Sequence, residues 1–175
     1  RGALAGPVVA AAVILPDEYD LAGLNDSKKV SPLKREKLFG KITNQAISIG
    51  VGIVSSHEID KINILESTYK AMKMSLGRLK PFPDEALIDG FPLTTQVIPN
   101  RGIIKGDEKI DVIKAASIIA KVTRDSIMLE YDMQYPMYAF KNHKGYGTKE
   151  HIKLLQLHKP CNIHRKTFKP VSSLV

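Results

Sequence analysis

Two stretches of the chain carry the apolar patterns of β-strands. Residues 8–15 form a continuous apolar run directly after Gly6-Pro7, which predicts a buried strand. Residues 46–54 instead alternate isoleucine and valine with serine and glycine, which predicts a second strand. Two shorter apolar segments, residues 86–88 and 103–104, predict the ends of two more strands, and an aspartate follows each within three residues.

Helical patterns and start signals fill the intervals between these strands. A helix is expected from Ser31-Pro32 to residue 44, because serine caps helices and proline tolerates the first turn. After a short helical turn at 55–58, a helix capped by Asn63 is expected to run to residue 79. Two further helices are expected at 109–132 and, capped by Thr148, at 148–157. Two strands come early in the chain, and the later strands alternate with helices. This order predicts an α/β domain with a mixed sheet.

Composition narrows the class of protein without identifying it. The 175 residues suffice for one domain with a real core, and 43% apolar with 25% charged residues is typical of globular proteins. The net charge of +8 favours a polyanionic partner, although a basic domain without such a partner fits equally well. No apolar run reaches transmembrane length, and the single thiol, Cys161, fits a reducing compartment.

Asp89 and Asp107 are the candidate acidic residues, because each follows a short apolar strand. Ligands of α/β sheets gather at strand ends, so the two side chains are expected to converge. Two converging carboxylates repel each other unless a proton or a cation lies between them, and Mg²⁺ or Mn²⁺ takes oxygen ligands of this kind. The alternative is that each aspartate caps a turn or a helix, with Asp107 capping the long helix that follows.

Two polar loops are candidates for binding a nucleic-acid backbone. Ser27, Lys28 and Lys29 follow Asp26 and could hold phosphate oxygens, unless they form an ordinary solvated turn. The run from His143 to Thr148 combines basic residues, two glycines and Tyr146. A tyrosine there could stack on a sugar or base and hydrogen-bond a 2′-hydroxyl. The alternative is a loop that enters a helix and carries a packed aromatic ring.

Taken in order, several segments of the chain resemble ribonuclease HII, the type 2 ribonuclease H. No single segment would suffice, but together they extend over the whole chain. The matching segments are Arg1-Gly2 with residues 4–13, residues 24–29, 87–90, 105–107, 115–125, 143–148 and 164–171.

The resemblance implies a ribonuclease H-like mixed sheet flanked by helices, forming a single domain over 1–175 with 133–175 as its substrate-binding loop and helix region. It implies an endonuclease that cleaves the RNA strand of RNA–DNA hybrids and nicks DNA 5′ of an embedded ribonucleotide. Cleavage would leave a 3′-hydroxyl and a 5′-phosphate. The cofactor would be Mg²⁺ or Mn²⁺, acting in a two-metal mechanism. Asp89 and Asp107 match the third and fourth of four catalytic, metal-binding carboxylates. The substrate-binding positions are Arg1, Gly2, Ser27, Lys28, Lys29, His143, Lys144, Tyr146 and Thr148. Among them, Tyr146 matches the tyrosine that senses the 2′-hydroxyl.

One departure from the family concerns the start of the chain. The family has Asp-Glu-Ala-Gly before the position of Arg1, which supplies the first two carboxylates on a central strand. We therefore expect the chain as written to lack these two acids and to be inactive or nearly so. We also expect either a slot between strands 8–15 and 86–88, or a direct pairing of these two strands with altered register. A fragment of this kind is expected to be unstable or to aggregate. A smaller departure is Lys159-Pro160, where the family has Gly-Pro.

Two alternatives remain beside this reading. A ribonuclease HIII-type enzyme is the nearer one, although that family has Gly-Thr-Gly where Arg1-Gly2 stands here. The other is a nucleic-acid-binding module without catalytic acids. For the favoured reading we expect a cytoplasmic protein that is monomeric at full length and has no membrane contact.

Overall fold

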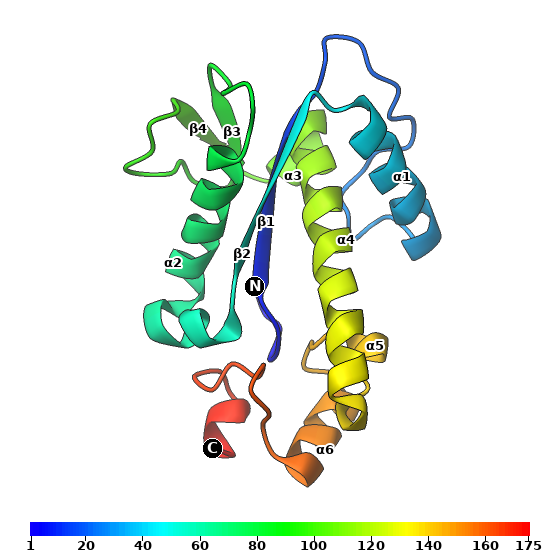
Figure 1. The fold of residues 1–175 in the computed structure, drawn as a ribbon, viewed down its shortest axis with the longest axis vertical. Coiled ribbons are helices and arrows are strands. Elements are labelled where there is room, and N and C mark those ends of the chain that lie inside the picture. Colours follow the sequence, from blue (N-terminus) through cyan, green and yellow to red (C-terminus); the bar gives the residue numbers. More distant parts are fainter. The chain divides into compact units, whose positions relative to one another are not determined.

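The computed structural model describes all residues, 1–175, as an α/β protein (Figure 1). Helices and strands lie close to where the apolar patterns predict them, and two short 3₁₀ helices are added near the end of the chain. The elements are β1 (Val8–Ile14), α1 (Pro32–Gln45), β2 (Ser48–Val54), α2 (Ser56–Gly77), β3 (Ala86–Asp89), β4 (Asn100–Ile103), α3 (Gly106–Lys109), α4 (Asp111–Gln134), a 3₁₀ helix (Pro136–Tyr138), α5 (Phe140–His143), α6 (Lys149–His158) and a 3₁₀ helix (Val171–Ser173). None of the helices combines the length and apolar character that a membrane span requires.

By their mutual contacts the residues group into two compact units. The sheet unit consists of residues 9–52 and 69–122, and the terminal unit consists of residues 1–8, 53–68 and 123–175. The region 133–175 lies entirely within the terminal unit. Its role as the substrate-binding part of one domain stays a prediction.

The strands form two separate pairs rather than one sheet. β1 lies beside β2, and Ile47 donates a backbone hydrogen bond to Ile14 at 2.9 Å, so the end of β1 meets the start of β2. β3 and β4 are parallel, with Ala86 opposite Asn100 and Asp89 opposite Ile103. β1 and β3 therefore belong to different sheets, although Ala12 of β1 shares an apolar cluster with Ala86 and Ile88 of β3. The expected slot between these strands stays a prediction, as does its proposed cause, a missing upstream strand.

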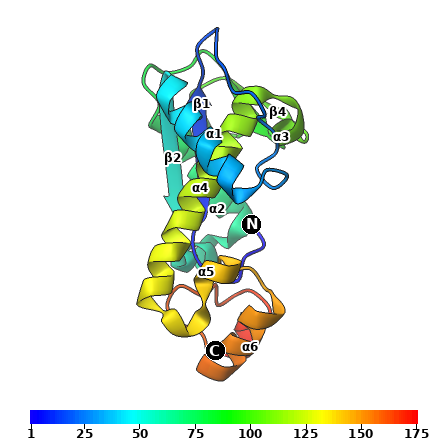
Figure 2. The same cartoon turned by 90° about the vertical axis from the view of Figure 1, so that its right-hand side faces the viewer.

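Two apolar clusters hold the sheet unit together. Leu38 and Ile42 of α1 pack with Val13 of β1 and with Ala115 and Ile118 of α4. Figure 2 shows α1 in front of the β1–β2 pair. The second cluster joins the end of α2 to β3 through Leu76, Leu79, Ala86 and Ile88. This packing positions β3, and therefore Asp89 at its end, against the C-terminal end of α2.

Aromatic and aliphatic side chains of distant segments form the core of the terminal unit. Ala5 packs with Met128, Tyr138 and Phe140. A second cluster joins Leu4, Leu155 and Val171. Both clusters bury the first residues of the chain among residues that follow position 123.

The expected helix boundaries are partly confirmed. Thr148 accepts a hydrogen bond from the His151 N–H at 3.2 Å, and the Asn63 side chain accepts from the Leu65 N–H at 2.9 Å. Asn63 also interrupts α2 with a φ of 68°. Ser31 occupies the N-cap position of α1 but makes no side-chain capping bond. The single helix expected at 109–132 is wrong at its start, because α3 ends at Lys109 and α4 begins at Asp111.

Candidate active site

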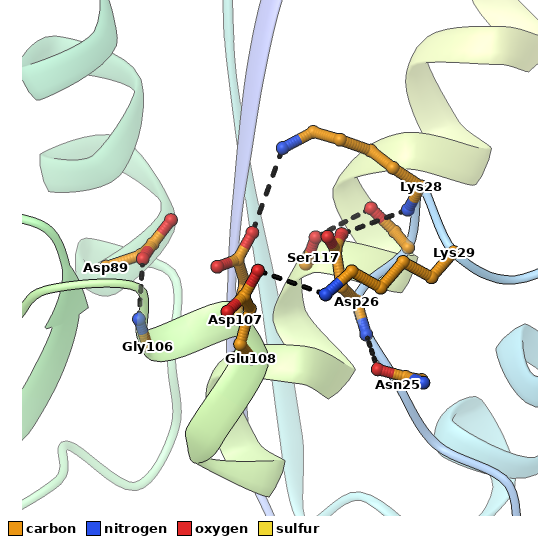
Figure 3. A network of polar contacts seen from close by, with 10 residues as sticks. Asn25, Asp26, Lys28, Lys29, Asp89, Gly106, Asp107, Glu108 and Ser117 are labelled. Carbon is orange, nitrogen blue, oxygen red and sulfur yellow. Dashed lines mark hydrogen bonds and ion pairs between the residues drawn. The ribbon is translucent and has the colours of Figure 1, made fainter.

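Asp89 and Asp107 are brought to the same side of the sheet unit by the turn that follows β4. The Asp89 carboxylate accepts a hydrogen bond from the Gly106 N–H at 2.9 Å. Lys105 takes a left-handed conformation, with a φ of 57°, and directs the chain into α3. A Cβ at Gly106 would lie 2.5 Å from Ile113, so glycine allows this close approach. Figure 3 shows Asp107 one residue further on, next to Asp89.

The structure does not support the capping alternative for Asp107. Lys105 holds the N-cap position of α3, which has no side-chain capping bond, and the long helix α4 begins only at Asp111. Asp107 lies in the first turn of α3 with its side chain mostly buried. A carboxylate in the first turn interacts favourably with the helix dipole. For Asp89 the structure does support the capping alternative, because its carboxylate accepts the N–H of Gly106, the first residue of α3.

The surroundings of Asp107 favour a bound cation. Burial raises the pKa of the Asp107 carboxyl above its ordinary value, and the negative charges of Asp89 and Asp26 raise it further. Lys28 opposes this shift from 3.8 Å, but its side chain is 80% exposed and the solvent weakens the pair. A group that resists ionisation because of neighbouring carboxylates is stabilised as an anion by any cation that binds between them.

Asp26 is a site residue that the sequence reasoning treated only as part of a loop. It is 5% exposed, and its carboxylate accepts the Lys28 N–H at 3.0 Å. Figure 3 shows it on the Lys28 side of Asp107, opposite Asp89. In the sequence, an aspartate beside Ser27 is typical of a turn. Nothing in the local pattern indicates that Asp26 lies near Asp107, which is about 80 residues further along the chain.

Ser27 and the two lysines lie in different environments. Ser27 is 4% exposed, and its hydroxyl lies 2.8 Å from the Ser117 hydroxyl of α4. Its role is therefore to dock the loop on α4, and the solvated-turn alternative is wrong at this residue. Lys28 and Lys29 are exposed, and Lys29 pairs with Glu108 at 3.1 Å. Both ammonium groups stand beside the Asp107 turn, where they could meet a phosphate.

The donor set at this site fits a divalent cation that keeps several ligands from water or phosphate. Asp89 and Asp107 offer hard carboxylate oxygens, and Asp26 adds negative charge near Asp107. Nowhere in the structure do three or more His, Cys, Asp or Glu side chains come together in a group that could hold a metal ion. The separation of about 3–7 Å that we expect between the Asp89 and Asp107 carboxylates, from two-metal spacing, stays a prediction.

Tyr146 lies on a loop of the terminal unit that pairs with the start of the chain. Ala3 forms an antiparallel bridge with Tyr146, and the Leu4 N–H donates to the Gly145 carbonyl at 2.8 Å. The guanidinium of Arg124 lies 5.1 Å from the centre of the Tyr146 ring. The tyrosine is 39% exposed, so part of the residue reaches the surface while Arg124 lies over its ring.

The other predicted residues of this loop mainly shape its backbone. His143 is 6% exposed, with its ring nitrogens bonded to the Tyr138 carbonyl at 2.9 Å and the Gly145 N–H at 3.2 Å. It supports the loop from inside instead of facing a ligand. Thr148 caps α6, as described above. Lys144 ends α5 with a φ of 50°.

Two buried arginines that the sequence reasoning missed hold the N-terminal segment. Arg124 donates to the carbonyls of Ala5 at 3.1 Å and Lys144 at 2.9 Å. Arg165 donates to the carbonyls of Gly6 and Pro7, and to that of Arg1. Arg1 and Gly2 are themselves exposed. Burial lowers the pKa of Arg165 to about 10, so it stays charged at neutral pH.

The fold is that of a type 2 ribonuclease H. The crystal structure of the ribonuclease H2 from Pyrococcus horikoshii OT3 superposes with a TM-score of 0.81 and covers 99% of this chain and 92% of its own. The two sequences are 24% identical, so this match shows the fold alone.

The chain belongs to the ribonuclease HII family, whose model matches residues 1–171. The ribonuclease HII of Acetivibrio thermocellus is 56% identical over 168 residues, which are 96% of this chain and 66% of that protein. The ribonuclease HII of Bacillus thuringiensis (strain Al Hakam) is 51% identical over 175 residues, 100% of this chain and 68% of that protein. The chain thus spans about two thirds of the length of these relatives.

Proposed function

We propose that this chain carries part of an endonuclease that hydrolyses the RNA strand of RNA–DNA hybrids and nicks duplex DNA 5′ of an embedded ribonucleotide. The observation that carries the proposal is the hydrogen bond from the Gly106 N–H to Asp89, which joins the end of β3 to the residue before Asp107. Burial and the negative charges of Asp89 and Asp26 raise the pKa of Asp107 there. Membership of the ribonuclease HII family supports the substrate class. A cytoplasmic location and a monomeric full-length protein belong to the same proposal.

Asp89 and Asp107 would hold Mg²⁺ or Mn²⁺. Bound divalent ions would supply charge neutralisation at the scissile phosphate and a water of lowered pKa, as in two-metal nucleases. In the hydrolysis, water oxygen bonds to phosphorus and the bond to the 3′ oxygen breaks, which leaves a 3′-hydroxyl and a 5′-phosphate. The Gly106 N–H fixes one oxygen of Asp89 and so keeps the carboxylate oriented before a ligand arrives.

The remaining residues would bind and select the substrate. Lys28 and Lys29 are exposed beside Asp107 and would contact backbone phosphates. Tyr146 would pack on the ribonucleotide sugar and meet its 2′-hydroxyl, and Arg1 and Gly2 would approach the same nucleotide. That Tyr146 and the aspartates act on one bound duplex is part of the proposal.

A nicking assay tests the proposal directly. Residues 1–175 are compared with the same chain preceded by the family's upstream strand and its Asp-Glu-Ala-Gly, on an end-labelled duplex containing one ribonucleotide. We expect Mg²⁺-dependent nicking 5′ of the ribonucleotide by the extended chain and little by residues 1–175. Robust nicking by residues 1–175 alone would refute the assignment of the absent acids.

The second candidate function, a binding module without catalysis, predicts a different result. The net charge of +8 and the exposed lysines favour it as much as they favour the nuclease. In that case the extended chain would bind the duplex and leave it intact at every Mg²⁺ and Mn²⁺ concentration.

A further inference from the structure

A line of buried histidines connects the C-terminal segment to the Tyr146 loop within the terminal unit. His151 and His164 are 0% and 1% exposed, and their Nε2 atoms lie 3.1 Å apart. The other ring nitrogen of His151 lies 2.9 Å from the Tyr146 carbonyl, and the other ring nitrogen of His164 lies 3.0 Å from the Cys161 N–H. The proposed function uses neither histidine.

For neutral rings, only one arrangement of protons satisfies all of these contacts. The Tyr146 carbonyl can only accept, so His151 carries its proton on Nδ1. Its Nε2 then accepts, and His164 must donate from Nε2. The Nδ1 of His164 in turn accepts from the Cys161 N–H. The hydrogen bonds therefore run in one direction, from Cys161 through His164 and His151 to Tyr146.

The surroundings keep both rings neutral, as this arrangement requires. Burial lowers the pKa of His151 to about 4, and the neighbouring His143 lowers it as well. Burial and the neighbouring His151 also lower the pKa of His164 to about 4. The His143 ring stacks on His151 with centroids 4.3 Å apart, which holds the His151 plane in place.

We infer that His151 and His164 are positioning residues for Tyr146, holding its backbone so that its ring is presented to a ribonucleotide at one angle. Tyr146 is then held from two sides, since Arg124 lies over its ring while the histidine line fixes its carbonyl. The hydrogen bond fixes the peptide group from which the side chain starts, and Arg124 restricts the ring itself. The inference rests on the proposed role of Tyr146 in sensing the ribonucleotide.

The proton arrangement can be tested on the unmodified chain without any substrate. Long-range ¹⁵N–¹H NMR spectra distinguish the two neutral forms of a histidine ring. We expect the Nδ1–H form for His151 and the Nε2–H form for His164 at pH 7. The opposite form at either residue, or a charged ring, would overturn the inference.

Paired variants test the effect on the substrate. The amide of His151→Asn replaces the Nδ1–H donor toward the Tyr146 carbonyl, whereas His151→Leu removes this donor. At His164, the amide of His164→Gln replaces the Nε2–H donor toward His151, whereas His164→Leu removes it. The readout is the ratio of dissociation constants for an all-DNA duplex and the same duplex with one ribonucleotide, measured without metal. The exposed His57→Gln in the same unit is the control.

The leucine variants are expected to lower this ratio by about threefold to tenfold, the effect of losing one hydrogen bond, with unchanged affinity for the all-DNA duplex. His151→Asn and His164→Gln should retain most of the ratio. A ratio unchanged in folded His151→Leu would overturn the histidine line alone. If the wild-type chain shows no preference for the ribonucleotide, the proposed role of Tyr146 is overturned. The positioning role of His151 and His164 then falls as well, whatever the protonation of their rings. If the leucine variants do not fold, the NMR spectra still decide the question, because the opposite ring form at His151 or His164 overturns the inference.

Discussion

The Asp89 carboxylate accepts a hydrogen bond from the Gly106 backbone, and this bond ties the end of β3 to the residue immediately before Asp107. The bond links the end of β3 to the first residue of α3 and orients one oxygen of Asp89. Any ligand that needs both oxygens finds one of them already oriented. The Asp89 carboxylate is thereby oriented without any bound ligand.

Removing either charge should weaken metal binding. Asp89→Asn keeps an oxygen that can accept from Gly106, so it tests the charge without breaking the turn. We expect Asp89→Asn and Asp107→Asn each to weaken Mn²⁺ binding to the chain by about tenfold or more, because each removes a charged ligand. Titration followed by electron paramagnetic resonance measures this. The exposed Asp84→Asn is the control, and equal affinities in all three variants would place the metal elsewhere.

The pKa of Asp107 should respond in opposite directions to its two neighbours. Asp89→Asn removes a negative charge and should lower the pKa of Asp107, whereas Lys28→Ala removes a positive charge and should raise it. Carboxyl ¹³C chemical shifts followed against pH report both changes. Lys41→Ala removes the same charge from an exposed pair with Asp20 and should leave Asp107 unaffected. A shift of the same sign in both variants would mean that a change of structure, not charge, is responsible.

Tyr146 should contribute through both its ring and its hydroxyl. In the chain with its upstream acids, we expect Tyr146→Ala to reduce ribonucleotide-specific nicking more than Tyr146→Phe, because alanine also loses stacking on the sugar. Alanine also removes the ring over which Arg124 lies. Initial nicking rates on the single-ribonucleotide duplex give the comparison. Parental activity in Tyr146→Ala would make the tyrosine purely structural.

Acid should destabilise the terminal unit through its buried histidines. The folded pKa values of His151 and His164, about 4 each, lie below the ordinary value of 6.5, so the unfolded chain takes up these protons first. Their contribution to stability is complete above pH 6.5 and is lost as the pH falls from 6.5 to 4. The free energy of unfolding should fall by at most about 1.4 kcal/mol per pH unit for each histidine. Urea unfolding at several pH values measures it, and the slope should be smaller in His151→Asn. Equal slopes in both proteins would contradict this assignment.

Two glycine-to-alanine changes should have opposite effects. Gly145 has a φ of +81°, and a Cβ there would lie 2.6 Å from the Ala5 carbonyl oxygen, so Gly145→Ala should cost about 1–3 kcal/mol. Gly40 lies inside α1 with open space around the added carbon, and Gly40→Ala should stabilise by about 0.5–1 kcal/mol. Denaturant midpoints decide both. A neutral Gly145→Ala would show that the loop can move away from Ala5.

Local patterns predicted much of the fold because they depend on residues close together in the chain. The apolar run at 8–15 and the caps Asn63 and Thr148 needed no knowledge of distant segments. The position of Asp89 at the end of β3, and that of Asp107 shortly after β4, followed from the same reasoning. The break between α3 and α4 was missed because Ile110 is an ordinary helix residue whose backbone turns extended only in its tertiary setting.

Long-range pairing explains what the sequence could not reveal. A buried arginine such as Arg165 looks in the sequence like any surface arginine, and the carbonyls that it contacts lie 158 and 159 residues away. The contact between His151 and His164 likewise depends on the path of the chain after α6. The division of the strands into two pairs depends on which edges meet, and apolar alternation does not encode that choice.

The anchoring of the first residues by Arg165 also orders events during synthesis. Gly6 leaves the ribosome 159 residues before the arginine that satisfies its carbonyl. At roughly 5–20 residues per second, that interval is about ten to thirty seconds. Throughout it, the residues around Gly6 have neither Arg165 nor the His164 bridge to Ala5. The terminal unit therefore closes only after Arg165 has been synthesised, and a ribosome that stalls before this residue leaves residues 1–8 without their anchor.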